Sequence, residues 1–325
     1  MKKLTLGIAL GFIAMINIAA ANSELPEIDL FIAEMVAEHD FDSQELTSIF
    51  SEVKVKQSIL KAISRPAEKS MPWHKYRKIF MQKKRMDDGA EFWRKHQTAL
   101  TDAETKYGVP AEVIIAILGV ETRYGGNVGS YRVIDALSTL AFRYPKRSKF
   151  FRSELKHFLL LTREEKLSPL NPIGSYAGAM GLGQFMPSSY REYAVDFDND
   201  GKRDIWTNRV DAIGSIANYL KRHGWVANES IVHQATLEGT IPTELLAKGY
   251  KPTLTRSALT AAKVSLASLP EGDDKIALFS LTQMEGESYW LARQNFYSIT
   301  RYNHSRMYAM AVKQLADGIR ASYEK

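Results

Sequence analysis

The stretch AILGVETRYGG, residues 116–126, constrains the fold more than any other segment. Written as a helix, it places Glu121 on a stripe formed by Ile114, Ile117 and Leu118. A carboxylate on an apolar stripe costs free energy unless something compensates for it. Because burial disfavours the charged form, such a glutamate can keep its proton near neutral pH and act as a general acid. The alternative is a glutamate at the rim of a structural helix, paired with a nearby arginine, and periodicity alone favours that alternative.

The surrounding chain predicts a mainly α protein. The apolar content of 45% and the charged content of 25% are those of a soluble globular protein. Asp42 and Glu45 form a capping box, which predicts a helix that starts there, and Pro110 occupies the first position of the helix that carries Glu121. Residues 231–290 instead hold short apolar runs and the turn PEGDD, which predicts a small β-containing insert.

The first 21 residues have the pattern of a signal peptide. Lys2 and Lys3 precede an apolar run that ends in three alanines. The alternative is an uncleaved membrane anchor, for which the run is short. The chain has no cysteine, which excludes disulfides, thiol catalysis, cysteine metal sites and a lipid-modified cysteine. We therefore expect a soluble protein outside the cytoplasmic membrane, in the periplasm.

The net charge is a weak guide to the binding partner. A formal charge of +6 suits an acidic partner in general. Nucleic acid is not expected as a partner, because the exported chain carries no nucleic-acid-binding motif.

Residues 168–187, SPLNPIGSYAGAMGLGQFMP, form a loop region dense in glycine and proline. Glycines let a backbone approach a ligand closely and expose its amide groups. Ser175, Tyr176, Gln184 and Tyr190 add hydroxyl, amide and aromatic groups, which suit a sugar chain with polar rims and apolar faces. A tight structural connection is the alternative, and this segment alone does not separate the two.

The segment DFDNDGKRDIW predicts a calcium site. Three alternating aspartates fill positions 1, 3 and 5 of an EF-hand loop, and Gly201 fills position 6. Position 12 is Thr207 where a standard loop has a glutamate, so a later aspartate is needed from a longer loop. The alternative is a solvated acidic turn between helices. The predicted ligands are Asp196, Asp198, Asp200, the carbonyl oxygen of Lys202, and Asp211.

Four motifs in this order, GVETRYG, GSYAGAMGLGQFMPSSY, DFDNDGKRDIW and DAIGSIANYL, together resemble the lytic murein transglycosylase B family. The resemblance extends from about Pro72 to the end of the chain. It implies a mainly α fold: a lysozyme-like α core with an additional α domain, a small β-containing insert and an EF-hand-like calcium loop. The implied division is 22–105 (N-terminal α region), 106–230 (core, with the calcium loop at 196–211), 231–290 (β insert) and 291–325 (closing segment).

The resemblance also implies roles for single residues. The catalytic acid of the family falls on Glu121. Family members named membrane-bound carry a lipid-modified cysteine, which this chain lacks, so that property does not transfer. The substrate-binding positions implied are Ser175, Gln184, Tyr219, Tyr76 and Tyr302.

The activity that the resemblance implies is cleavage of the bond between N-acetylmuramic acid and N-acetylglucosamine in peptidoglycan, with a 1,6-anhydro product and a structural role for calcium. The implied partners are glycan strands and proteins of cell-wall synthesis. Ordinary glycosidases use two carboxylates, and Asp135, fourteen residues after Glu121, reads as a helix-start residue. The alternatives are a lysozyme-type hydrolase, a non-catalytic wall-binding or scaffold protein and, least favoured, a calcium sensor.

Overall fold

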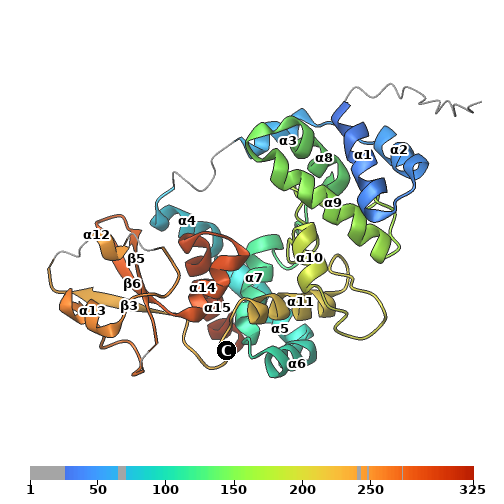
Figure 1. The fold of residues 1–325 in the computed structure, drawn as a ribbon. Helices are drawn as coiled ribbons and strands as arrows, with labels where there is room; N and C mark the ends of the chain where they lie inside the picture. Colours follow the sequence, from blue (N-terminus) through green and yellow to red (C-terminus); the bar gives the residue numbers. More distant parts are fainter. Residues whose placement is uncertain (1–25, 65–70, 240–242, 247–248, 273) are drawn as a thin grey trace, which may run out of the picture. The chain divides into compact units, whose positions relative to one another are not determined.

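The computed structural model describes residues 26–64, 71–239, 243–246, 249–272 and 274–325 (Figure 1). The described residues up to Ser51 and the described residues from Glu52 onward form two compact units, which are described separately. The predicted signal peptide lies outside the described residues. None of the helices within the described ranges is long and apolar enough to cross a membrane.

The described part of the first unit is a helix pair, α1 (Pro26–His39) and α2 (Ser43–Ser51). Phe31 and Phe50 pack edge to face between them, with ring centroids 5.8 Å apart. The backbone N–H of Glu45 donates to Oδ1 of Asp42 over 2.7 Å, which confirms the predicted cap of α2.

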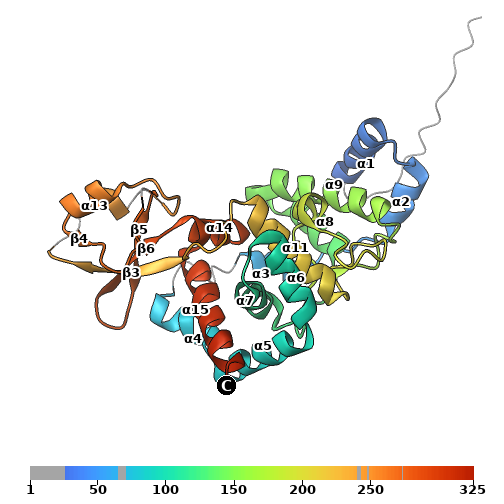
Figure 2. The ribbon, with the colours of Figure 1, turned by 90° about the horizontal axis from the view of Figure 1, so that it is seen from below.

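The second unit is built around α7 (Ala111–Thr122). Figure 2 shows this helix surrounded by α5, α6, α11 and α15, each of which packs against it. The side chains from Val113 to Leu118 are at most 2% exposed, so α7 is buried on all sides rather than along one stripe. The other helices of this core are α4 (Trp73–Phe80), α5 (Lys83–Lys95), α6 (Gln97–Tyr107), α11 (Arg209–Arg222), α14 (Gln294–Tyr302) and α15 (Arg306–Tyr323).

A helical hairpin follows the short strand β1 (Tyr131–Arg132). Strand β1 pairs antiparallel with β2 (Ile173–Gly174), in the register Tyr131 to Gly174, so the two ends of the hairpin meet beside the glycine-rich loop. The pairing of β1 with β2 therefore joins the glycine-rich loop to this helical hairpin. The elements of the hairpin and its neighbours are α3 (Gln57–Ile63), α8 (Val133–Arg143), the 3-10 helix η1 (Pro145–Arg147), α9 (Ser148–Glu164) and α10 (Pro187–Tyr193).

The β-containing insert is confirmed as a four-stranded antiparallel sheet, in the order β4-β3-β6-β5. Its own apolar core includes Leu259, Ile276 and Leu291, each fully buried. The sheet adjoins α4 through β5 and α14 through β6 (Figure 1). The elements are β3 (Val232–Leu237), α12 (Thr243–Leu246), α13 (Arg256–Ala261), β4 (Val264–Ser265), β5 (Ala277–Thr282) and β6 (Glu287–Ala292).

Candidate active site

Glu121 lies in the last turn of α7, where the helix reaches the surface of the core. Ile114, Ile117 and Leu118 are buried as predicted, at 0%, 0% and 1% exposure. Glu121 itself is half-buried, so the expectation of a buried carboxyl is wrong in degree. The helix ends at Arg123 in a left-handed conformation, and the apolar stripe ends with it. The carboxyl group is therefore held at the core and remains accessible.

Tyr308 of α15 fixes this carboxyl group. Its hydroxyl donates to Oε1 of Glu121 over 2.6 Å, and its side chain is only 2% exposed. Burial, followed by the negative charge of Glu121, raises the pKa of Tyr308 well above its usual value of 10. Tyr308 therefore keeps its proton over the working pH range and acts as a hydrogen-bond donor.

Sequence analysis missed Tyr308. The only signal for it is the amphipathic pattern of the last helix, which does not reveal which residue of α7 it meets, 187 positions earlier.

Tyr302 and Tyr219 extend this contact into an aromatic cluster. The Tyr302 ring lies parallel to that of Tyr308, with centroids 6.4 Å apart and an interplanar angle of 8°. The Tyr219 ring meets Tyr302 edge to face at 4.8 Å. Both hydroxyls donate to backbone carbonyls, Tyr302 to Gly183 and Tyr219 to Arg301. The structure thus brings Glu121 and two of the predicted tyrosines together.

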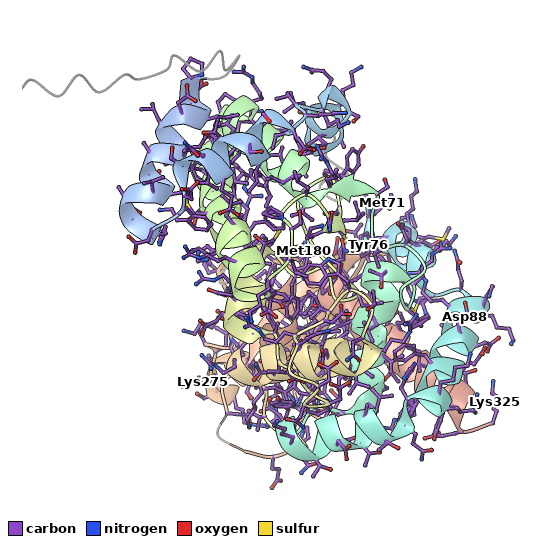
Figure 3. The ribbon with its side chains drawn as sticks, turned by 90° about the vertical axis from the view of Figure 1, so that its right-hand side faces the viewer. Met71, Tyr76, Asp88, Met180, Lys275 and Lys325 are labelled. Carbon is purple, nitrogen blue, oxygen red and sulfur yellow. The ribbon has the colours of Figure 1, made fainter. Side chains whose placement is uncertain are left out.

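Tyr76 of α4 reaches the same cluster. It is 4% exposed and packs against Phe80, with ring centroids 5.2 Å apart. Its hydroxyl contributes to the raised pKa of Tyr308, after burial and Glu121. Figure 3 shows Tyr76 close to Met71, which precedes α4 in sequence. A third predicted position therefore lies near Tyr308, the residue that holds Glu121.

The glycine-rich loop is tied to the neighbours of Glu121 on two sides. The hydroxyl of Thr122, the next residue along α7, donates to the carbonyl of Leu182 over 2.9 Å. The carbonyl of Gly183 accepts from Tyr302. A Cβ at Gly183 would lie 2.8 Å from that hydroxyl, so this close approach requires glycine. Thr122 was not singled out from the sequence, although it adjoins Glu121.

Ser175 and Gln184 lie in this loop with much of their polar capacity already used. Oγ of Ser175 accepts from the backbone N–H of Ala179 over 3.0 Å. Nε2 of Gln184 donates to the carbonyls of Gly181 and Val128, over 2.9 Å and 3.2 Å. Both side chains shape the loop, and a ligand can accept or donate only at the polar groups that these bonds leave free.

Asp135 has a structural role. Its Oδ1 accepts from the Arg132 guanidinium over 2.8 Å and from the backbone N–H of Lys54 over 2.9 Å. Its Oδ2 accepts from Nε of Arg132 over 3.0 Å. The carboxyl is 3% exposed at the start of α8, as the sequence predicted.

The predicted calcium loop brings three carboxylates together. One oxygen atom each from Asp196, Asp198 and Asp211 lie within 4.8 Å of one another, and Asp211 is fully buried. Burial raises the pKa of Asp211 to about 6, and the charges of Asp198 and Asp196 add to this effect. Such an oxygen set fits a hard cation. Asp200 is not part of this group, and its Oδ1 accepts from the backbone N–H of Lys202 over 2.9 Å.

Comparison with known proteins identifies the class. Residues 24–317 match the family described as the transglycosylase SLT domain, and the chain therefore belongs to this family. Together with the relatives below, this match defines the chain as a lytic transglycosylase, an enzyme that cleaves peptidoglycan.

Particular relatives agree with this class. The membrane-bound lytic murein transglycosylase B of Escherichia coli (strain K12) is 43% identical over 303 residues, which cover 90% of this chain and 82% of that protein. The crystal structure of soluble lytic transglycosylase SltB1 from Pseudomonas aeruginosa has a TM-score of 0.87 and 49% identity, over 92% of this chain and 100% of that chain. Escherichia coli Slt35, solved in complex with calcium, has a TM-score of 0.84 and 42% identity, over 93% and 95% of the two chains. The predicted family and mainly α fold are confirmed.

Proposed function

We propose that this lytic transglycosylase cleaves the β-1,4 bond between N-acetylmuramic acid and N-acetylglucosamine, with Glu121 as its single acid and base. The observation that carries the proposal is the contact between Glu121 and Tyr308, in which a half-buried carboxyl is fixed by a fully buried hydroxyl. A general acid must be held in place and still reach its substrate. Glu121 meets both conditions.

In the first step, Glu121 gives its proton to the glycosidic oxygen, and the bond from that oxygen to C1 of the muramyl residue breaks. The N-acetyl group of the same residue stabilises the positive charge that develops on C1. In the second step, the C6 oxygen attacks C1, and its proton passes to the Glu121 carboxylate. The protons balance, the acid is restored, and no water is consumed.

One carboxylate suffices for this route, because the substrate supplies both the stabilising group and the nucleophile. A two-carboxylate glycosidase would need a second acid at a defined separation. Asp135, the next carboxylate along the chain, is held by Arg132 and by the backbone of Lys54. Its geometry therefore favours a structural role over a catalytic one.

The tyrosines and the glycine-rich loop are proposed to bind the glycan strand. The hydroxyls of Tyr219 and Tyr302 are used by backbone carbonyls, and Tyr219 is only 7% exposed, so the partly exposed ring of Tyr302 is the one that we propose for a sugar face. Tyr219 is proposed to support the ring of Tyr302, and Tyr76, at 4% exposure, is proposed to support Tyr308 from the side of α4. Ser175 and Gln184 would offer polar contacts at the rim of the sugars.

Calcium is proposed to stabilise the fold and to take no part in the reaction. Asp196, Asp198 and Asp211 would supply carboxylate oxygens, with Asp200 and the Lys202 carbonyl completing the set. The calcium complex of Slt35 supports the assignment. Bound calcium would neutralise charges that otherwise repel one another.

We further propose that the protein acts in the periplasm after removal of residues 1–21, on glycan strands and beside proteins of cell-wall synthesis. We propose that the mature chain is divided into functional regions at 22–105, 106–230, 231–290 and 291–325. The core would hold the reaction, and the β insert would adjoin it.

The test is digestion of purified murein sacculi in water enriched in oxygen-18. A transglycosylase releases 1,6-anhydro products without the heavy isotope, whereas a lysozyme-type hydrolase adds one labelled oxygen to each new reducing end. Unlabelled anhydromuropeptides are the expected result. Labelled reducing ends would show that the enzyme is a hydrolase and would contradict the proposal. The absence of any soluble product would indicate a non-catalytic wall-binding protein.

A further inference from the structure

A cavity of about 340 Å³ lies where the starts of α4 and α15 meet the end of β5. Its walls are mostly apolar and aromatic. Figure 1 shows α4 beside β5, and α4 also packs against α15; Figure 3 labels Met71, which precedes α4 in sequence. The residues that matter for the argument are Met71, Trp73, Tyr250, Leu281, Thr282 and Arg306.

Arg306 is the one arginine among the described residues that line this cavity. Its side chain is half-buried, and it forms neither a hydrogen bond nor an ion pair with any residue that the structure describes. It also lies in the first turn of α15, which contains no acidic residue. A cation there is at the unfavourable end of the helix dipole. An arginine on a half-buried side chain with no counter-charge among the described residues is the arrangement that an anionic ligand would complete.

The cavity adjoins the candidate active site through two helices. Arg306 and Tyr308 are two positions apart on α15, about 3 Å along its axis and on different faces. Tyr308 turns to Glu121 and Arg306 lines the cavity. On α4, Trp73 precedes Tyr76 by about one turn, and their rings are 6.2 Å apart. The cavity and the candidate active site therefore share α4 and α15, and a peptide of several residues attached to a sugar at Glu121, at about 3.3–3.6 Å per residue, is long enough to extend from one to the other.

We propose that this cavity binds a carboxylate of the peptide stem on the glycan strand being cleaved, with Arg306 as its partner. The proposal rests on the proposed function, since it places the stem relative to the cleaved bond. The sugar rings carry no charge, whereas the stem carries carboxylates on short aliphatic residues. Arginine binds a carboxylate through two parallel hydrogen bonds, and Trp73, Leu281 and Met71 offer apolar walls for the aliphatic part.

The experiment compares two substrates that differ only in stem charge. Glycan strands with free stem carboxylates are set against the same strands after conversion of those carboxylates to methylamides. For the wild-type enzyme, kcat/KM should fall about tenfold on the methylamide strands, mainly through KM, because the charge-assisted pair is lost. Arg306→Gln should show the same loss on free-carboxylate strands and no loss on methylamide strands.

Lys275→Gln is the matched control. Lys275, labelled in Figure 3, is exposed and precedes the start of β5 by two residues, whereas Thr282 ends that strand, roughly 20 Å away along the extended chain. Lys275→Gln removes one positive charge, as Arg306→Gln does, and it should leave kcat/KM unchanged on both substrates. Arg306→Lys keeps the charge and loses the two-point geometry, so its preference for free carboxylates should lie between those of Arg306→Gln and the wild type.

Three results would overturn the proposal. Equal wild-type kcat/KM on the two substrates would show that the enzyme does not bind the stem carboxylates, whatever the variants do. An equal loss for Arg306→Gln on both substrates would mean that Arg306 supports the fold or Tyr308 instead. No loss on either substrate would leave the cavity without a role in binding the stem. Failure of the proposed function is separable, because the wild type would then release no anhydro product from either substrate.

Discussion

Tyr308→Phe tests the contact on which the site depends. The substitution keeps the ring, its parallel packing on Tyr302 and its burial, and it removes only the hydroxyl that donates to Glu121. Because the pKa of Tyr308 is raised well above 10, the wild-type hydroxyl is a donor at any pH suited to an assay. The change therefore isolates one hydrogen bond to the reacting carboxyl group.

The magnitude follows from the geometry. A hydrogen bond to a charged group contributes about 1.5–3 kcal/mol, and half-burial of Glu121 places this bond near the middle of that range. A loss of about 2 kcal/mol from the transition state corresponds to about a 30-fold lower kcat/KM. The free energy of unfolding should change by less than about 1.5 kcal/mol, because water can reach the carboxyl in place of the hydroxyl.

The assay is the release of anhydromuropeptides from sacculi, run beside a melting curve. Tyr190→Phe is the control, because Tyr190 is fully buried and its hydroxyl donates to the backbone carbonyl of Arg203 over 2.6 Å. That variant should lose stability and keep its rate. The reasoning is refuted if Tyr308→Phe stays within threefold of the wild-type rate, or if both variants lose activity equally.

Three further predictions concern stability. Calcium at 100 times its dissociation constant should stabilise the fold by about 2.7 kcal/mol and raise Tm by roughly 5–10 °C. Asp211→Asn should abolish this stabilisation. Identical melting curves with calcium and with a chelator would contradict the calcium site. Gly129→Ala should cost roughly 2–4 kcal/mol in chemical unfolding, because Gly129 has φ +97° and its Cβ would lie 2.0 Å from the Gly174 carbonyl oxygen. Gly286→Ala, at φ +69° with open space, should cost only about 1 kcal/mol, and equal losses would contradict the steric argument. At saturating calcium, the free energy of unfolding should fall as pH drops below about 6.5. Several histidines have a lower pKa in the folded chain than in the unfolded chain, so the unfolded chain binds more protons there. A constant Tm from pH 7 to pH 5 would contradict this prediction. Burial lowers the pKa of His96, His157, His223, His233 and His304.

Local patterns predicted much of the fold. The cap at Asp42 is a contact over three residues, and the hydrogen bond from Glu45 confirms it. The apolar run of α7 and the turn before β5 are equally local, which explains why the helical core and the β insert could be expected. The burial of α7 on all sides was not expected, because periodicity shows one stripe and not how many helices surround it.

The candidate site was only partly predictable. Glu121 stands out because its charge conflicts with its stripe, which is a local signal. The hydroxyls of Tyr219 and Tyr302 bond to backbone carbonyls, which no side-chain pattern encodes. Tyr308 and Arg306 acquire their surroundings only when α15 packs against α7 and near α4. Asp211 is an intermediate case, since its acidity was visible but its burial beside Asp196 depends on the fold of the loop.

The most direct test of the central claim is the rate of anhydromuropeptide release by Glu121→Gln. The amide keeps the shape of the side chain and can still meet Tyr308, but it has no proton to transfer. One proton-transfer group contributes roughly 10²–10⁴-fold, and Glu121 serves in both steps, so the loss should reach or exceed the top of that range. Its melting temperature should stay at or above that of the wild type, because a half-buried ionisable group is costly. A folded Glu121→Gln enzyme that releases these products at near the wild-type rate would place the acid elsewhere and contradict the mechanism.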